Sequence, residues 1–297
     1  QYNKQFTQPI NQIAQISSML QSMIAAAERI FEFLEEPEEV VTAKSNITTD
    51  KLKGNVKFEH VKFGYDSSRT IINDFNAEVK EGQKIAIVGP TGAGKTTMVK
   101  LLMRFYDVTD GEISVDGHNI KDFDRGDLRK MFGMVLQDTW LFGGTVKENI
   151  KYSKEDATET EVIEAAKAAH IHHFIKTLPK GYNSLINEES TNISAGQKQL
   201  LTIARVILAD PKILILDEAT SSIDTRTEIQ IQAAMDNLMK GRTSFIIAHR
   251  LSTIKNADLI LVMNHGDIVE QGKHEELLAK NGFYAELYNS QFEEVEE

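Results

Sequence analysis

The sequence predicts an α/β fold with a mostly parallel sheet, and three observations lead to this prediction. Four short apolar runs have the composition of buried strands, and they lie at residues 85–88, 213–216, 244–248 and 259–263. Segments with helical periodicity separate these runs, and a glycine-rich loop follows the first of them. Strands that alternate with helices favour a parallel sheet, which binds its ligands at the carboxyl ends of its strands.

The first 36 residues are predicted to form one amphipathic helix, because apolar residues recur at three- and four-residue steps from Ile10 to Leu34. The pattern stops at Pro37, where a helix is expected to end, and residues 37–53 have the polar composition of a linker. Periodicity alone favours packing of this helix on its own domain. The tail of a helix from another domain fits the same pattern.

Alternating apolar residues at 56–58 and 61–63 predict short strands, which we assign to an antiparallel β subdomain. A helical insertion subdomain is expected over about 138–200, with no strong strand between 150 and 200. The remaining expected segments are helices at 98–105, 161–169 and 197–208 and an acidic tail at 291–297.

Composition excludes several classes of protein. The 297 residues include 33 Lys and Arg against 44 Asp and Glu, for a net charge of −11, which argues against nucleic acid as the main partner. The chain has no cysteine, so disulfides, thiol nucleophiles and Cys-ligated metals are absent. No apolar run approaches the ~20 residues that span a bilayer. Because the sequence starts at Gln1 and not at methionine, we expect a fragment of a longer protein.

The glycine-rich loop at residues 89–96 matches the phosphate-binding pattern GxxxxGK[ST] between a strand and a helix. Glycines let backbone N–H groups surround phosphate oxygens, and the helix N-terminus adds partial positive charge. Lys95 is expected to reach the β- and γ-phosphates of ATP, and the Thr96 hydroxyl to ligate Mg²⁺. The residues expected to hold the nucleotide phosphates are Gly89, Thr91, Gly92, Ala93, Gly94, Lys95, Thr96 and Thr97.

Acidic residues and a histidine follow two of the predicted strands. Asp217 and Glu218 end the run at 213–216, and we assign Asp217 to Mg²⁺ and Glu218 to the attacking water as general base. His249 follows the run at 244–248, where an imidazole would reach the γ-phosphate. Alone, the acidic pair would be read as a strand-end cap and the histidine as structural, so both assignments depend on the phosphate loop.

Together these residues resemble the nucleotide-binding domain of an ABC transporter, over about residues 54–290. Segment 192–197 (NISAGQ) is similar to the LSGGQ signature, and segment 221–224 (SSID) to the D-loop. The resemblance implies a P-loop NTPase, RecA-like core. It also gives Gln137 the place of the Q-loop glutamine, which ligates Mg²⁺ and takes part in catalysis, and His249 that of the switch histidine. Further nucleotide contacts implied by the resemblance are Tyr65, as the adenine-stacking aromatic, and Ser194, Ala195, Gly196, Gln197 and Asp224.

Several segments are similar in amino-acid sequence to those of exporters of the multidrug and lipid type, namely 102–107 (LMRFYD), 137–142 (QDTWLF) and 148–150 (ENI). In such exporters six membrane helices precede this domain. By that resemblance residues 1–36 are the end of the last membrane helix, which reverses the preference drawn from periodicity.

The resemblance implies a motor domain that dimerises around two ATP molecules and hydrolyses them to export a hydrophobic or drug-like substrate. Its partners would be a membrane-spanning domain, at the cytoplasmic face of the cell membrane, and a second nucleotide-binding domain, with a heterodimer slightly favoured. Ala195 departs from the signature and would be costly if the backbone there needs a positive φ. Glu188 occupies the position of the acidic residue of the X-loop, within a local sequence that differs from that of the family.

Three alternatives remain. Another ABC-type ATPase, of DNA repair, chromosomes or translation, would carry coiled coils or basic surfaces that this sequence lacks. A module that binds ATP only to associate would have lost Glu218 or His249. A metal site at His170, His172 and His173 would need an acidic partner, and a solvated helix surface fits these residues better.

Overall fold

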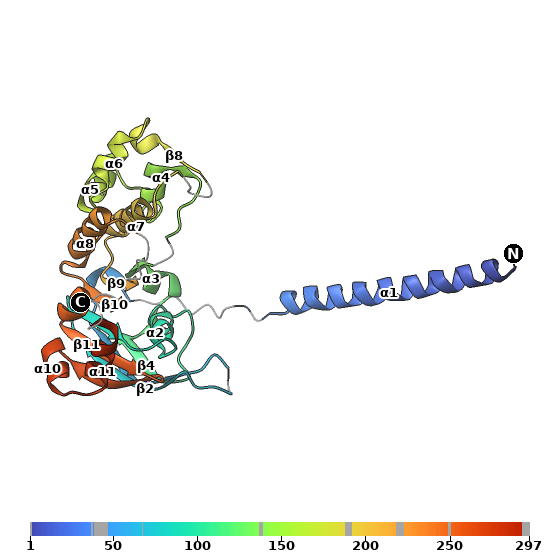
Figure 1. Ribbon diagram of the computed structural model, residues 1–297, viewed down its shortest axis with the longest axis horizontal. Coiled ribbons are helices and arrows are strands. Elements are labelled where there is room, and N and C mark those ends of the chain that lie inside the picture. The colour runs from blue at the N-terminus through green and yellow to red at the C-terminus, as the bar shows by residue number, and fades with distance from the viewer. Residues whose placement is uncertain are drawn as a thin grey trace. The chain divides into compact units, whose positions relative to one another are not determined.

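The computed structural model describes residues 2–36, 38, 47–66, 68–136, 139–187, 192–217, 223–248 and 251–292. The chain divides into two units, Gln1–Val41 and Thr42–Glu297. The first unit contains helix α1, Tyr2–Leu34, which confirms the predicted helix (Figure 1). Large apolar side chains such as Ile13, Met23 and Phe31 are exposed along it. Among the described helices, none combines the length and the apolar composition that a bilayer crossing requires.

The second unit is built on a six-stranded sheet in the order β12-β11-β3-β10-β9-β6. All neighbouring strands pair in parallel except β12, which runs antiparallel to β11. The strands of this sheet are β3 Lys84–Val88, β6 Phe132–Val135, β9 Ile213–Asp217, β10 Thr243–Ile247, β11 Leu259–Asn264 and β12 Asp267–Gly272. The predicted α/β class with a mostly parallel sheet is confirmed, and each of the four predicted apolar runs forms one of its strands, although Ala248 lies just past the end of β10.

A second, antiparallel sheet has the order β2-β1-β4-β5. Its strands are β1 Val56–Phe63, β2 Ile72–Val79, β4 Asp110–Val115 and β5 His118–Asn119. The two short strands predicted at 56–58 and 61–63 are one strand with a bulge, where His60 has a φ of 48°. Gly111 faces this bulge, and a Cβ there would lie 2.2 Å from the His60 carbonyl oxygen. The bulge therefore requires glycine on the neighbouring strand.

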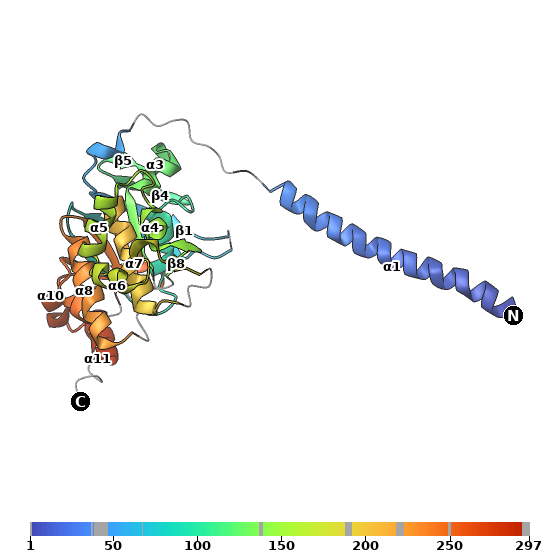
Figure 2. The ribbon, with the colours of Figure 1, turned by 90° about the horizontal axis from the view of Figure 1, so that it is seen from above.

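The remaining elements are mainly helices. Those of the second unit are α2 Lys95–Leu102, α3 Arg125–Lys130, α4 Val146–Lys151, α5 Glu159–Ala168, α6 His172–Thr177, α7 Ala195–Ala209, α8 Thr225–Met239, α9 Leu251–Lys255, α10 His274–Ala279 and α11 Phe283–Phe292, with single 3-10 turns at Thr49–Lys51, Ile120–Asp122 and Gly181–Asn183. Helices α4, α5 and α8 pack around α7 (Figure 2). In the region expected to lack a strong strand, a two-residue strand, β8 Leu185–Ile186, pairs with β7 Gly144–Thr145.

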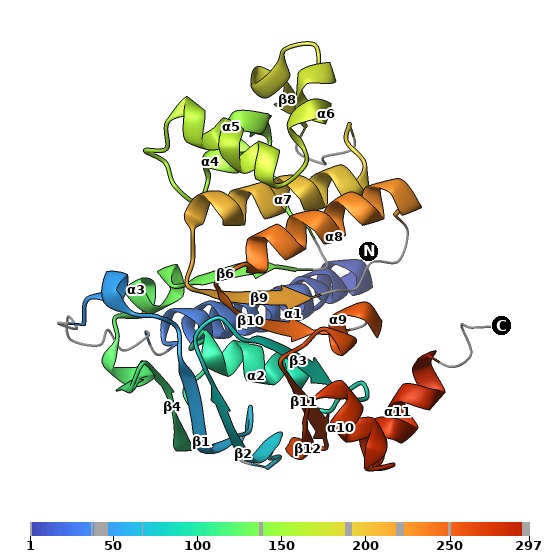
Figure 3. The ribbon, with the colours of Figure 1, turned by 90° about the vertical axis from the view of Figure 1, so that its left-hand side faces the viewer.

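Two apolar cores lie on the two faces of the parallel sheet. Alternate residues of β9 separate between them: Leu214 and Leu216 face the core shared with α7 and α8, whereas Ile213 and Ile215 face the core shared with α2 and the antiparallel sheet. Figure 3 shows α7 and α8 on one side of the strands and α2 with β1 on the other. A sheet buried on both faces needs continuous apolar strands, which is why these runs stand out in the sequence.

Candidate functional site

Four parallel strands end together at the carboxyl edge of the main sheet. Ile87 of β3 and Asp217 of β9 both pair with Ile247 of β10, and Leu216 pairs with Val135 of β6. The phosphate-loop sequence follows β3 at this edge, and Asp217 ends β9 there. Functional side chains predicted from separate parts of the sequence are thus brought to one edge.

The three predicted catalytic residues, Gln137, Glu218 and His249, lie outside the described residues, as do Glu188 and the first two residues of the D-loop segment. The described residues that directly precede the three are Leu136, Asp217 and Ala248, which follow or end strands at this carboxyl edge. The roles of these three residues therefore stay predictions.

The phosphate loop owes its glycines to backbone geometry. Gly92 and Gly94 have positive φ angles of 82° and 102°, and Gly94 is the N-cap of α2. A Cβ at Gly89 would lie 2.2 Å from the Met263 carbonyl oxygen at the end of β11, and one at Gly94 would lie 2.8 Å from Cδ1 of Ile72. The loop is therefore fixed between β11 of the main sheet and β2 of the antiparallel sheet, and side chains are excluded from its tightest turns.

Lys95 begins α2 and its side chain folds back over the loop. Its Nζ donates hydrogen bonds to the carbonyl oxygens of Gly89 and Pro90, at 2.7 and 3.0 Å. Burial lowers the pKa of the Lys95 ammonium from its ordinary value, and the negative charge of Asp217 opposes that shift. The cation of the loop and the carboxylate of β9 therefore act on each other at the same site.

The site has the chemistry that MgATP requires. The first backbone N–H groups of α2, at Lys95, Thr96 and Thr97, have no carbonyl partner within the helix and suit phosphate oxygens. Thr96 carries a hydroxyl and Asp217 a carboxylate, which are oxygen groups of the kind that Mg²⁺ prefers, and their role as its ligands stays a prediction. Within the described ranges, no cluster of three or more His, Asp or Glu side chains is arranged to hold a metal ion. A Mg²⁺ ion that accompanies a nucleotide is usually held by one or two protein oxygens together with substrate phosphates and water.

Tyr65 lies beside the same helix, directly after β1. Its hydroxyl is 3.3 Å from Oγ1 of Thr97, and its side chain is 48% exposed. An aromatic surface is thus present next to the phosphate loop, where the resemblance expects the adenine. Sequence reasoning missed its neighbour Tyr106, whose ring centroid lies 5.1 Å from that of Tyr65.

The signature segment forms the N-terminus of α7. Ser194 caps this helix: its hydroxyl accepts from the Gln197 backbone N–H at 3.3 Å, and Gln197 Oε1 accepts from the Ser194 N–H at 2.9 Å. Ala195 is the first residue of α7 and is not among the residues with positive φ. The condition under which Ala195 would be costly is therefore not met.

Gly196 has a different reason to be glycine. A Cβ at this position would lie 2.3 Å from Cγ2 of Thr227 on α8. Asp224 caps α8, because its carboxylate accepts the Thr227 backbone N–H at 3.0 Å, and hydrogen bonds from Thr227 lower the pKa of Asp224. The structure thus places Asp224 as a helix cap beside the signature, and its contact with nucleotide stays a prediction.

The histidines weighed as a metal site do not lie on one helix. His170 follows α5 with a φ of 57°, whereas His172 and His173 begin α6. Nδ1 of His172 lies 2.8 Å from the hydroxyl of Tyr182. A hydrogen bond within the helical subdomain therefore accounts for His172.

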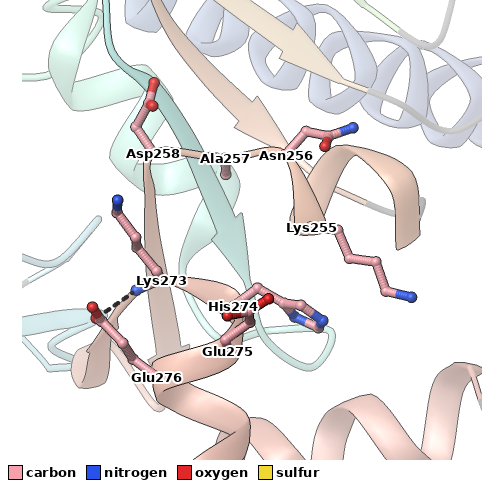
Figure 4. A pocket seen from close by; sticks show the side chains of 8 residues that line it. All are labelled: Lys255, Asn256, Ala257, Asp258, Lys273, His274, Glu275 and Glu276. Carbon is pink, nitrogen blue, oxygen red and sulfur yellow. Dashed lines mark hydrogen bonds between the residues drawn. The ribbon is translucent and has the colours of Figure 1, made fainter.

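A hollow of about 590 Å³ lies elsewhere, where α9 leads into β11 and β12 leads into α10. Figure 4 shows that both acidic and basic side chains line it, among them Asp258, Lys273 and Glu275. Because Asp258 precedes β11, the hollow is at the amino edge of the parallel sheet, opposite the phosphate loop. It is not part of the candidate site.

The fold and the loop define a P-loop nucleotide-binding domain, and comparisons with known proteins give its family. The family model described as ABC transporter matches residues 72–221. The chain belongs to the ABC transporter family, as its ATP-binding, ATPase domain.

Several relatives are similar over nearly the whole chain. The uncharacterized ABC transporter ATP-binding protein YfiC of Bacillus subtilis is 51% identical over 99% of this chain and 48% of its own length. The fatty acid ABC transporter ATP-binding/permease protein of Mycobacterium tuberculosis is 53% identical over 97% of this chain and 45% of its own length. The ATP-dependent lipid A-core flippase of Syntrophus aciditrophicus is 43% identical over 97% and 48%, respectively.

A solved structure, of a bacterial Atm1-family ABC exporter with ATP bound, matches with a TM-score of 0.81 and 41% identity, over 93% of this chain and 48% of that one. The chain therefore spans about half the length of the relatives it matches. The resemblance to the ABC family and to its exporters is confirmed.

Proposed function

We propose that this chain is the motor domain of an exporter, which binds MgATP at the loop of residues 89–96 and hydrolyses it to drive transport. The observation that carries the proposal is the position of Lys95 and Asp217 at the carboxyl edge of the sheet, where the charge of one acts on the other. A cation on the phosphate loop beside a carboxylate is the arrangement that phosphoryl transfer to water uses.

Each residue of the site has a defined task in this proposal. Lys95 leaves the carbonyl oxygens of Gly89 and Pro90 and neutralises the β- and γ-phosphates, while the N–H groups at the start of α2 hold their oxygens. Thr96, Asp217 and Gln137 would hold Mg²⁺, which when bound neutralises phosphate charge. Glu218 orients and deprotonates the attacking water, and His249 donates to the γ-phosphate.

The second anion site of the domain is the N-terminus of α7. Ser194 keeps its hydroxyl proton free for a phosphate when its oxygen accepts from Gln197, and the helix dipole favours negative charge there. We propose that Ser194 to Gln197 meet the γ-phosphate held by a second nucleotide-binding domain, with Asp224 near the same interface. The two domains would then close around two ATP molecules, and hydrolysis would release them.

The partner domain and the substrate follow from the relatives. The fatty acid relative is named an ATP-binding/permease protein, so a membrane-spanning domain is the proposed partner, and α1 with its exposed apolar residues would belong to it. The motor would then work at the cytoplasmic face of the cell membrane. Relatives named for fatty acids, lipid A-core and multidrug export favour a hydrophobic or amphipathic substrate.

Two measurements test the function. The chain should hydrolyse ATP in the presence of Mg²⁺, and Glu218→Gln should retain ATP binding while turnover is lost; binding without turnover in the unaltered chain would instead indicate a module that only associates. Light scattering of Glu218→Gln, with and without ATP, tests pairing. A rise to about twice the 33.4 kDa of one chain means self-pairing. An unchanged mass would point to a different partner chain, as in a heterodimer, or to closure that depends on the membrane-spanning domain.

A further inference from the structure

Three aromatic rings from two loops and one strand contact one another beside the phosphate loop. Phe63, at the end of β1, is buried, whereas Tyr65 and Tyr106 are 48% and 43% exposed. The ring centroids are 5.0 Å apart for Phe63 and Tyr65, 5.1 Å for Tyr65 and Tyr106, and 5.6 Å for Phe63 and Tyr106. Each ring therefore touches the other two, and we call this set the aromatic triangle.

Within the triangle, Tyr65 meets both neighbours nearly at right angles, with interplanar angles of 83° to Phe63 and 85° to Tyr106. Edge-to-face contacts of this kind are favourable and fix the plane of a ring. Among the described rings, none stacks parallel on Tyr65. No described aromatic ring therefore takes the parallel position that a nucleotide base adopts on an aromatic ring.

Helix α2 holds the same ring from another side. The Tyr65 hydroxyl lies 3.3 Å from Oγ1 of Thr97, two residues beyond Lys95, and Nζ of Lys100 lies 5.6 Å from the ring centroid. The ring is therefore tied to the helix whose N-terminus is expected to hold the phosphates. A base stacked on Tyr65 and phosphates on the loop would then have a fixed separation.

We propose that Tyr106 is a positioning residue for nucleotide binding: it acts through Tyr65, by holding that ring in the plane on which the base stacks. This inference rests on the proposed function, because it assumes ATP at the loop of residues 89–96. In this inference Tyr106 affects the binding of the base and does not affect the binding of the phosphates. Fixing the ring before the base arrives reduces the entropy that binding must overcome.

The test compares two ligands that share phosphates and differ in the base. ATP and inorganic tripolyphosphate are titrated in Mg²⁺ buffer into the full 297-residue chain by calorimetry. Tyr106→Ala should weaken ATP binding about two- to tenfold, the range for one aromatic pair, and leave tripolyphosphate binding unchanged. Tyr106→Phe, which keeps the ring, should restore the affinity of the unaltered chain for ATP.

The adjacent Phe105 supplies a matched control. It is 46% exposed, and its ring lies 4.9 Å from the Arg129 guanidinium, outside the triangle, so Phe105→Ala should change neither affinity. In a Tyr65→Ala background, Tyr106→Ala should cause no further loss, because residues that act through one another are not additive.

Two results with Tyr106→Ala would overturn the inference: equal weakening of ATP and tripolyphosphate binding, or the same loss of ATP affinity in the Tyr65→Ala background. An unchanged ATP affinity in Tyr65→Ala would also overturn it, because the base would then stack elsewhere. That last result would not contradict the proposed binding of ATP at the phosphate loop, because the contribution of Lys95 to ATP binding is measured separately.

Discussion

Gly196 of the signature gives a prediction whose size follows from helix packing. In Gly196→Ala the new methyl group would lie 2.3 Å from Cγ2 of Thr227 and 3.2 Å from Cγ2 of Ile223. Thr227 is β-branched and lies in the first turn of α8, so it has few rotamers with which to avoid the methyl group. Helices α7 and α8 must move apart, at the cost of overpacking, which is about 1–3 kcal/mol of unfolding free energy.

The assay is urea unfolding of the chain, followed by circular dichroism, as a double-mutant cycle with Thr227→Ser. Serine removes Cγ2 and leaves Thr227 Cβ, at 3.4 Å from the added atom, as an ordinary contact. In this background the cost of Gly196→Ala should fall below about 1 kcal/mol, because residues in contact couple. The neighbouring Ala195→Gly is the control, with an expected change within about 1 kcal/mol. Equal costs of Gly196→Ala in both backgrounds would refute the packing explanation.

Two further predictions concern the loop and a helix cap. Gly89→Ala should destabilise the chain by about 1–3 kcal/mol and abolish ATP binding, since its Cβ would meet the Met263 carbonyl at 2.2 Å. Gly92→Ala, with open space around it, should cost only the ~1–2 kcal/mol of a left-handed φ. Unfolding and ATP titrations of both variants measure these effects, and a larger loss in Gly92→Ala than in Gly89→Ala would contradict the geometry. The hydrogen bond from Lys154, with those from Thr158, lowers the pKa of Glu161 from 4.5 to about 2. Because the folded-state pKa is lowered, the stability that ionised Glu161 contributes is present above pH 4.5 and is lost as the pH falls toward 2. Glu161→Gln should therefore lose less stability over that range in acid titrations, and an identical pH dependence would show that the cap is not ionised.

The sequence allowed the main sheet and the phosphate loop to be predicted because both have local signals. The strand at 213–217 is buried on both faces and therefore continuously apolar, and glycines at 89, 92 and 94 are needed by the loop itself. These features require no knowledge of distant residues.

Features that depend on contacts between distant segments were not predicted. The bulge at His60 exists because Gly111, on another strand, leaves room for its carbonyl. The need for glycine at 196 comes from Thr227, and the orientation of Tyr65 comes from Tyr106. The concern over Ala195 assumed a positive φ, which a residue inside the first turn of α7 does not have. For the bulge, Gly196 and Tyr65, the deciding atom lies on an element that periodicity cannot place.

The central claim, that this chain binds MgATP through the cation of its phosphate loop, is tested most directly by titrating ATP in Mg²⁺ buffer into three forms of the chain. The forms are the unaltered chain, Lys95→Ala, and Lys130→Ala as a control, since the Lys130 side chain is 76% exposed on α3 and pairs only with Asp127 among the described ion pairs. Lys95→Ala loses a charge-assisted contact of about 1.5–3 kcal/mol, so its affinity for ATP should be more than about tenfold lower than that of the unaltered chain. Lys130→Ala should bind ATP as the unaltered chain does. An ATP affinity of Lys95→Ala equal to that of the unaltered chain would contradict the claim.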